Sequence, residues 1–199
     1  MNVLIVYCHP SKNSFTNAVR ESFIKGLTDG GHTYEQSDLY AMEFNPVFSE
    51  SEYRREAYYD TAAAVSDDVI TEQEKINRAD AIAFIYPVFW TECPALLTGW
   101  FQRVFTYGFA YGEKTMKVLE QAFFLVTMGG SQKDPIRQEQ IQAMKTVMIG
   151  DRLHDRAKRF AFTVFDEMTR GYGNDDNRAE RFKEFVQQAY TLGKNCDAQ

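Results

Sequence analysis

The sequence is poor in the residues that build metal sites and disulfide frameworks. Its 199 residues include only three cysteines and three histidines. Cys8, Cys93 and Cys196 form no CxxC pair, and the histidines are scattered without the spacing of metal ligands. We therefore expect no metal site and no disulfide framework, and this cysteine usage suits a reducing cytoplasm.

Excess positive charge and long hydrophobic runs are also missing. The chain has 22 Lys and Arg against 28 Asp and Glu, a net charge of -6, so it offers no basic field for nucleic acid. The longest nearly apolar run, residues 81–90, is far shorter than the roughly 18 residues that span a bilayer. The amino terminus lacks the basic start of a secretion signal. We expect a cytoplasmic protein without membrane insertion or nucleic-acid binding.

Several nucleotide-binding and hydrolase motifs do not occur. Without GxGxxG or GxxxxGK[ST], the sequence gives no support to a dinucleotide-binding Rossmann site or a nucleoside triphosphatase. Without GxSxG, it gives none to a serine hydrolase. No repeat, low-complexity tract or linker divides the chain. Its length and its 44% hydrophobic residues predict a single domain over residues 1–199.

The sequence does contain a regular alternation of short apolar runs and amphipathic segments. Strands are predicted at residues 3–7, 33–38, 81–86, 122–127 and 160–165. Helices are predicted from Ser14 to the glycines at 30 and 31, and at residues 67–77, 94–105, 135–149 and 178–192. Such alternation is typical of an α/β fold with a parallel sheet covered by helices on both faces.

Residues 40–66 do not fit this alternation. The segment mixes aromatic and charged residues, and it is too apolar for a disordered tail and too long for an ordinary connection. We expect it to pack over the body of the protein or against another subunit. A structured surface excursion without a role is an equally good interpretation.

Three loops, 8–16, 87–93 and 128–134, are expected at the carboxyl ends of the strands, where such sheets bind ligands. In the first, the hydroxyls of Ser11, Ser14 and Thr16 and the free amides of the following helix suit a phosphate. No glycine-rich cradle is present there. Serine and threonine in front of a helix also serve simply as caps, which is the more common role.

The second and third loops suit a flat ring. Trp90 follows the third strand and provides a planar wall, whereas its neighbour Phe89 is as readily a buried core residue. Gly129 and Gly130 let the backbone approach a ligand closely, although a simple turn explains them equally well. Taken together, a phosphate pocket, an aromatic wall and a bare backbone edge describe a flavin mononucleotide moiety.

Four segments carry a family resemblance: HPSKNSFTNA at 9–18, SDLYAMEFNPVF at 37–48, YPVFWTECPALLTGWFQRVFTYGFAYG at 86–112 and VTMGG at 126–130. The chain resembles the flavodoxin-like NAD(P)H:quinone oxidoreductases, the DT-diaphorase group and its shorter bacterial relatives. The resemblance implies a flavodoxin-like three-layer sandwich with strand order 2-1-3-4-5 and a bound flavin. It also implies a homodimer with the active site near the subunit interface. A ping-pong hydride transfer from NAD(P)H to quinones or related electron-poor aromatics would follow.

The resemblance also assigns site residues. It places His9, Ser11, Asn13, Ser14, Phe15 and Thr16 at or near the phosphate end of the flavin. The ring would be bordered by Pro87, Val88, Phe89 and Trp90, and its polar edge would be approached by Thr127, Met128, Gly129 and Gly130. Tyr111, from the partner subunit, and Trp90 would line the reacting face as catalytic residues. For His9, a purely structural role in the loop is the alternative.

The sequence departs from the family at the site. The tyrosine and histidine that follow the double glycine in mammalian-type enzymes are Pro135 and Ile141 here, a second pocket tyrosine is Glu113, and SFTN replaces the usual SFN. The familiar proton-handling pair is therefore missing. His154 is a candidate substitute, although a charged surface helix end is its more usual setting.

The nature of the flavin and the role of the protein have alternatives. The GWFQRVF segment resembles the FAD-binding members, and many short bacterial relatives hold FMN, so we expect FAD with FMN as a close alternative. NAD(P)H is the expected co-substrate and a small aromatic molecule the acceptor. The competing functions are a regulatory subunit of a potassium-efflux system and a flavodoxin-type electron carrier.

Overall fold

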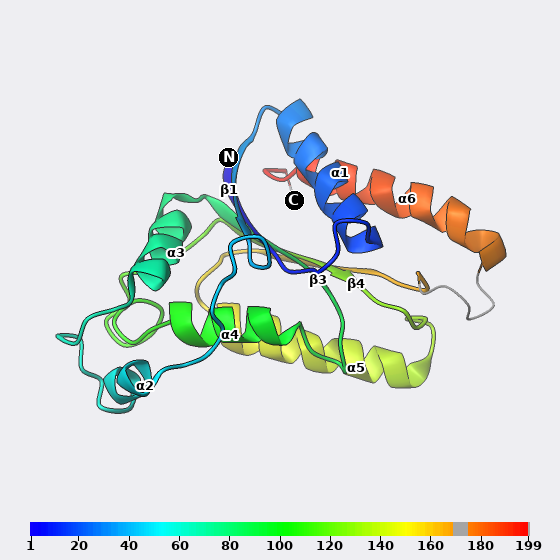
Figure 1. Cartoon of the computed structure of the whole chain (residues 1–199). Helices are drawn as coiled ribbons and strands as arrows, with labels where there is room; N and C mark the ends of the chain where they lie inside the picture. Colours follow the sequence, from blue (N-terminus) through cyan, green and yellow to red (C-terminus); the bar gives the residue numbers. More distant parts are fainter. Residues whose placement is uncertain (169–174, 199) are drawn as a thin grey trace.

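Five parallel strands form one sheet in the order β2-β1-β3-β4-β5 (Figure 1). The computed structural model describes residues 1–168 and 175–198. The strands are β1 (Asn2–Tyr7), β2 (Thr33–Asp38), β3 (Ala81–Pro87), β4 (Gln121–Thr127) and β5 (Phe160–Phe165). The predicted strand order is confirmed, and every strand lies within one residue of its predicted bounds.

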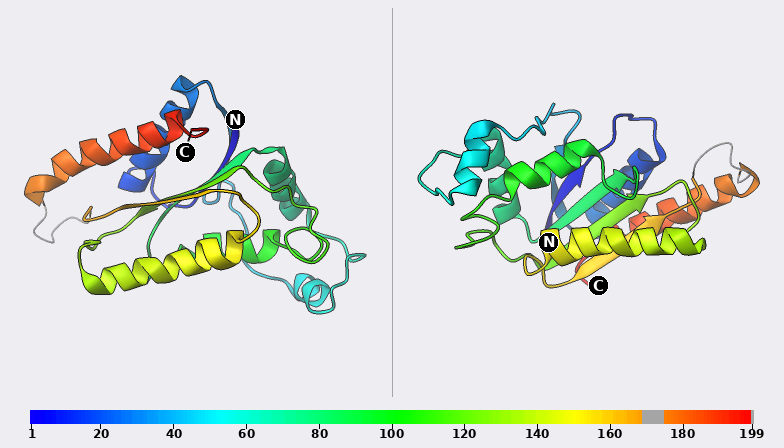
Figure 2. Two further views of the ribbon diagram at one scale, coloured as in Figure 1. Left: turned by 180° about the vertical axis from the view of Figure 1, so that it is seen from behind. Right: turned by 90° about the horizontal axis from the view of Figure 1, so that it is seen from below.

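Helices cover both faces of the sheet (Figures 1 and 2). One face carries α1 (Phe15–Asp29) and α6 (Asp175–Lys194). The other carries α3 (Asp67–Arg78), α4 (Ala95–Val104) and α5 (Pro135–Lys145), which continues as the π-helix η1 (Thr146–Leu153). The predicted three-layer flavodoxin-like architecture is therefore confirmed. No helix in the described part of the chain is both long and apolar enough to cross a membrane.

The central strands owe their position to burial on both faces. Every residue of β3 and β4 is buried, as expected for near-continuous apolar runs in a parallel sheet. Side chains alternate between the faces, so Phe123 meets Phe23 of α1 with ring centroids 5.7 Å apart, while its neighbour Phe124 points to the opposite face. Both faces of the sheet therefore carry a hydrophobic core.

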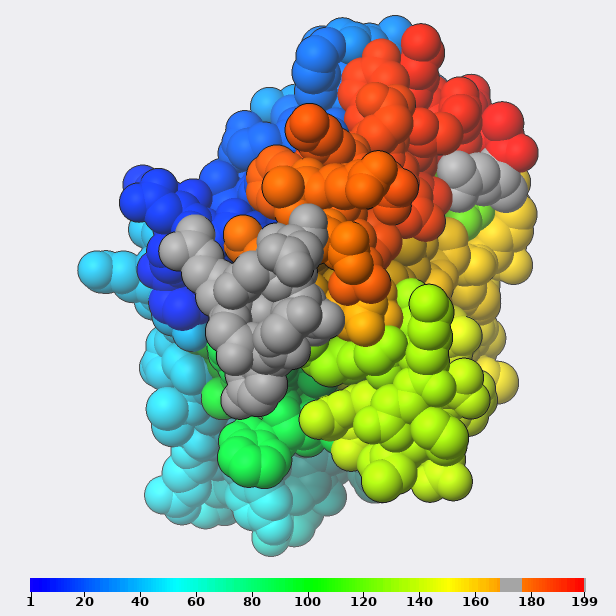
Figure 3. Space-filling view, turned by 90° about the vertical axis from the view of Figure 1, so that its right-hand side faces the viewer, coloured from blue at the N-terminus to red at the C-terminus, as the bar shows by residue number. Residues whose placement is uncertain are grey.

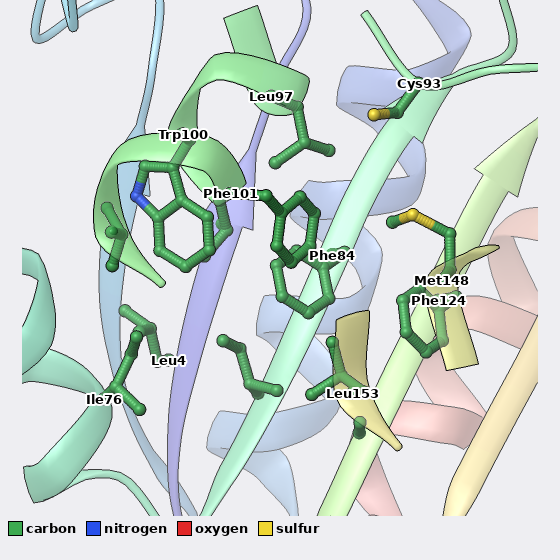
Figure 4. Close-up of a cluster of buried hydrophobic side chains, with 14 of the residues drawn as sticks. Leu4, Ile76, Phe84, Cys93, Leu97, Trp100, Phe101, Phe124, Met148 and Leu153 are labelled. Atoms are coloured by element: carbon green, nitrogen blue, oxygen red, sulfur yellow. The ribbon is translucent and has the colours of Figure 1, made fainter. Parts of the chain in front are cut away.

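The larger core lies beneath α4 (Figure 4). Phe84 stacks on Phe124 with ring centroids 5.4 Å apart and meets Trp100 edge-on at 5.9 Å. The indole N–H of Trp100 donates to Glu72 Oε2 at 2.9 Å, and the other oxygen of this fully buried carboxylate accepts from Lys75 at 2.6 Å. The buried carboxylate of Glu72 thus has a partner for each oxygen, as burial requires.

Residues 40–66 pack over α4 and include a helix that the sequence did not predict, α2 (Glu50–Ala57). Arg103 of α4, only 5% exposed, holds the segment in place. Its guanidinium donates to the Asn45 carbonyl at 2.7 Å and pairs with Glu52 at 2.7 Å and with Asp68 of α3 at 2.5 Å. The backbone at Pro46 passes so close that a Cβ on Gly99 would lie 2.4 Å from it.

The helix predicted at residues 135–149 is wrong at its carboxyl end. The α-helical pattern stops at Lys145, and a π-helix follows to Leu153. The buried residues Met144, Met148 and Leu153 are four and then five residues apart, wider than the 3.6-residue period. The wider π-helical turn keeps Leu153 on the core face, which a continuous α-helix would not do.

Candidate functional site

Three loops leave the sheet at one edge because the parallel strands end in register. Backbone bonds continue the sheet for one residue beyond each strand: the N–H of Cys8 donates to Ile85, that of Val88 to Thr127 and that of Met128 to Phe165, at 2.9–3.1 Å. Figure 3 looks onto this edge and shows blue, green and yellow-green parts of the chain on the same face. The loops after β1, β3 and β4 therefore converge, as the topology predicted.

A buried hydroxyl pair joins the first and third of these loops. Thr16 lies in the first turn of α1, and Thr127 ends β4. Their Oγ1 atoms are 2.7 Å apart, and the two residues are 2% and 7% exposed. This hydrogen bond fixes the start of α1 to the end of β4, although the residues are 111 positions apart.

The loops enclose two adjacent hollows. The large hollow, of about 580 Å³, is lined by Val88, Trp90, Thr91, Met128, Gly129, Gly130, Ser131, Arg137, Gln140 and Glu167. The small hollow, of about 200 Å³, is lined by His9, Phe15, Thr16, Pro87, Val88, Phe89, Thr127, Met128, Gly129 and Met168. Three residues line both, so the hollows adjoin. Of these two, the large hollow has the volume of a typical small-molecule site.

Most of the residues predicted to bind a cofactor line these hollows, and three do not: Ser11, Asn13 and Ser14. Ser11 Oγ accepts from the Asn13 N–H at 3.2 Å within the loop. Ser14 is the N-cap of α1, and its Oγ accepts from the Asn17 N–H at 3.1 Å. Ser14 therefore has the capping role that is common for a serine in front of a helix.

His9 faces the small hollow as a neutral hydrogen-bond donor. Burial lowers the pKa of its imidazole below the ordinary value of 6.5. Its Nδ1 lies 2.9 Å from the Ser11 N and 3.1 Å from the Ser11 O, and in the tautomer in which Nδ1 accepts from the Ser11 N–H the proton is on Nε2. A ring held in this way offers one N–H to a ligand, beside the free amides of α1.

The loop after β3 is a tight turn in a strained conformation. Phe89 and Glu92 exchange two backbone hydrogen bonds at 2.9 and 3.0 Å, which enclose Trp90 and Thr91. Both enclosed residues have positive φ, 53° and 64°, a conformation that β-branched and bulky residues rarely adopt. The turn leaves Trp90 fully exposed beside the large hollow. Strain of this kind, about 1–3 kcal/mol per residue, concentrates at functional sites.

The end of β5 contributes a fourth segment that the sequence analysis did not include. The Gln132 N–H donates to Asp166 Oδ2 at 2.7 Å, which ties the loop after β4 to residues 166–168. Glu167 and Met168 line the two hollows as a result. Placing a ligand loop after the predicted fifth strand, as after the other three, would have identified them.

Arg137 and Gln140 were also missed. Both lie on α5, whose predicted start at Pro135 is correct, and they are three positions apart, so they share a helix face. They line the large hollow next to Gly130 and Ser131. The sequence feature that could have identified them is their position, in the first turns of a helix that directly follows the double glycine.

Tyr111 and His154 lie outside the hollows of this chain. The Tyr111 hydroxyl donates to Glu56 Oε2 at 2.6 Å, and the Tyr107 N–H donates to the same oxygen at 2.7 Å. Burial and the Glu56 carboxylate raise the pKa of the Tyr111 phenol, which therefore stays protonated. His154 is exposed at the end of η1.

The thiols near the site are unsuited to nucleophilic or redox chemistry. Cys8 and Cys93 are unpaired and buried. Burial raises the pKa of Cys8 to about 12 and that of Cys93 to about 11, so both remain thiols at neutral pH. The arrangement is that of a binding site whose chemistry depends on a bound group.

Comparison with known proteins places the chain in a family. A model of proteins with the flavodoxin-like fold matches residues 1–191. The structure of the NAD(P)H:quinone oxidoreductase from Methanothermobacter marburgensis is similar, with a TM-score of 0.90 and 38% identity, over 99% of this chain and 97% of that one. A FMN-dependent NADH-azoreductase from Bacillus anthracis, seen in complex with FMN, shares the fold at 15% identity, with a TM-score of 0.66 over 96% and 99% of the chains.

A curated relative gives the same assignment over a shorter length. NAD(P)H dehydrogenase [quinone] 1 from Cavia porcellus is 35% identical over 147 residues, which cover 65% of this chain and 54% of that protein. The chain thus spans about half the length of the curated relatives it matches. Together with the match over residues 1–191, these similarities show that the chain belongs to the flavodoxin-like family that includes the NAD(P)H:quinone oxidoreductases.

Proposed function

We propose that the protein is a flavin-dependent oxidoreductase that takes a hydride from NAD(P)H and passes it to quinones or related electron-poor aromatic compounds. The observation that carries the proposal is the convergence of the loops after β1, β3 and β4 around two adjoining hollows. The similarity to quinone oxidoreductases supports the same activity.

The residues at this edge fit a flavin. The small hollow offers the donors that a phosphorylated tail needs: the amides of the first turn of α1 and the Nε2–H of His9. The large hollow offers an aromatic wall at Trp90 and a bare backbone at Gly129 and Gly130 for a flat polar ring. Because the hollows adjoin, one molecule with a ring and a phosphorylated tail can occupy both.

The bound flavin would supply the hydride chemistry, and the protein residues would position the reactants. No side chain has to act as a nucleophile, in agreement with the raised pKa values of Cys8 and Cys93. The exposed Trp90 turn would border the open side, where nicotinamide and acceptor bind in turn. The backbone amides at 129 and 130 would hydrogen-bond the polar edge of the ring.

We propose FAD as the flavin, with FMN as the alternative. The resemblance that favours FAD rests on residues 99–105, but α4 buries Trp100, Phe101 and Arg103 in the core, and these side chains offer no group to a ligand in this chain. The support for FAD therefore comes from the resemblance alone. The mass of the cofactor released by heating the purified protein distinguishes the two flavins.

We also propose a homodimer in which Tyr111 lines the site of the partner subunit. Three exposed tyrosines in the segment around α2 support an interface on this side: Tyr53, Tyr58 and Tyr59 are 60%, 74% and 63% exposed. Tyr59 lies against Tyr107 with ring centroids 4.8 Å apart, and Tyr107 lies against Tyr111 at 5.4 Å. The aromatic surface is thus continuous with Tyr111. The three free cysteines favour a cytoplasmic location.

The substitution Trp90→Ala tests the proposed function. Loss of an aromatic wall worth about 1.4 kcal/mol weakens flavin binding roughly tenfold. Flavin affinity by fluorescence quenching and steady NAD(P)H oxidation with a quinone are the measurements. Tyr34→Ala, another exposed aromatic at the opposite end of the sheet, is the matched control. A colourless protein that takes up neither FAD nor FMN would refute the proposal, and a flavoprotein that does not oxidise NAD(P)H would refute the activity.

A further inference from the structure

The wall of the large hollow carries a positive charge that no carboxylate in residues 1–168 and 177–198 neutralises. Arg137 lines this hollow beside Gly129 and Gly130. Within the described residues its guanidinium donates one side-chain hydrogen bond, to Gln140 Oε1 at 2.6 Å, and forms no ion pair. The acid in the same wall, Glu167, is paired with Arg181 at 2.5 Å. The large hollow therefore favours an anionic group next to Arg137.

The start of α5 determines where this charge lies. Asp134 caps the helix and accepts from the Ile136 N–H at 2.9 Å, and Pro135 occupies the first turn. Side chains on a helix tilt toward its amino terminus, so Arg137 lies back over the preceding loop. A Cβ added to Gly130 would be 2.7 Å from Arg137 Nε, which shows how closely the guanidinium follows the backbone there.

Two neighbouring positions on α5, Pro135 and Ile141, carry no charge. Ile141 is 9% exposed, packs with Met128 and Met144, and is not among the residues that line the large hollow. Of the side chains that line the large hollow, Arg137 and Glu167 are the charged ones, and Glu167 is paired with Arg181.

We propose that Arg137 stabilises the negative charge that the flavin ring carries after two-electron reduction. The inference rests on the proposed function, which places the polar edge of the ring at the backbone of Gly129 and Gly130. A guanidinium is protonated at any physiological pH, so this charge is permanent. A bound ring excludes water from the hollow and strengthens the attraction. Arg137 therefore makes the site bind the reduced flavin more tightly than the oxidised flavin.

The consequence is measurable as a redox potential. Arg137→Gln keeps a hydrogen-bonding side chain and removes the charge, and we expect the preference for reduced over oxidised flavin to fall about tenfold. For a two-electron couple this change lowers the midpoint potential by about 30 mV. Sulfite, which adds to the oxidised ring and leaves a negative charge on it, should bind about tenfold more weakly to the same variant. Arg137→Lys, which keeps the charge, should change both quantities much less.

The potential and the sulfite affinity are measured with saturating flavin, beside Lys133→Gln as control. Lys133 is an exposed cation of the same loop that does not line the large hollow. A wild-type protein that binds no flavin would refute the proposed function, and this inference with it. Flavin bound by every variant with an unchanged potential and sulfite affinity would overturn the inference alone. An unchanged potential with a raised KM for NADPH but not for NADH would assign Arg137 to the dinucleotide phosphate and also overturn it.

Discussion

The hydroxyl pair of Thr16 and Thr127 should hold the first and third ligand loops together. The two Oγ1 atoms are 2.7 Å apart in a buried setting, and both residues line the small hollow. Replacing either threonine by valine keeps the shape of the side chain and removes the hydroxyl. We therefore expect Thr16→Val and Thr127→Val to loosen the contact between α1 and β4 and to weaken flavin binding.

The magnitude follows from what each substitution leaves behind. A single valine removes one hydrogen bond and leaves the other hydroxyl buried without its partner, which costs about 1–3 kcal/mol of unfolding free energy. In the double variant no hydroxyl is left unpaired, so its cost should be close to that of one single variant. The coupling energy in a double-mutant cycle should therefore be about 1 kcal/mol or more. In a chain of this size, 1 kcal/mol corresponds to about 2–4 °C in Tm.

Thermal and denaturant unfolding of the three variants, together with flavin affinity, provide the test. Thr28→Val is the matched control, because Thr28 lies exposed on the same helix and its hydroxyl bonds only to the Ile24 carbonyl one turn back. It should change the unfolding free energy by less than about 0.5 kcal/mol. Strictly additive costs for the two single variants would show that the hydroxyls do not interact, and the reasoning would be wrong.

Two further predictions concern stability. Phe84→Ala removes the ring that packs against Phe124 and Trp100. It should lower the free energy of unfolding, measured in denaturant melts, by about 3–5 kcal/mol. A smaller cost would mean that the core collapses around the cavity. The Asn2 N–H and Lys117 lower the pKa of the Asp80 carboxyl below its ordinary value of 3.8. The ionised carboxylate therefore stabilises the fold above pH 3.8, and this stabilisation is lost as the pH falls through the lowered pKa. The stability difference between wild type and Asp80→Asn should therefore shrink between pH 6 and pH 2, and a constant difference would contradict this.

The parts of the fold that the sequence predicted depend on local patterns. The central strands are buried on both faces, so their residues read as continuous apolar runs that can be recognised without the tertiary structure. α1 begins at a serine cap and repeats its apolar residues at helical spacing. Once the strands are parallel, their carboxyl ends share an edge, and the convergence of the three loops follows from topology alone.

The parts that were not predicted depend on contacts between distant residues. α2 is held by Arg103, whose ion pairs with Glu52 and Asp68 join three segments and leave no periodic signal. The bond between Tyr111 and Glu56 likewise joins residues 55 positions apart. The π-helix η1 arises because the core requires Leu153 at a spacing that an α-helix does not provide. Such features depend on the packed structure and are invisible to periodicity.

The two sides of the large hollow differ in how firmly they are held. The Gly129 side extends directly from β4 and is tied to β5 by the bonds from Met128 to Phe165 and from Gln132 to Asp166. The Trp90 side is a two-residue turn closed by its own pair of backbone bonds, with the indole fully exposed. A ring in the large hollow would thus meet a polar edge held by two strands on one side and an exposed aromatic turn on the other. This arrangement would suit the proposed reaction, in which the flavin stays in place while NAD(P)H and the acceptor bind in turn.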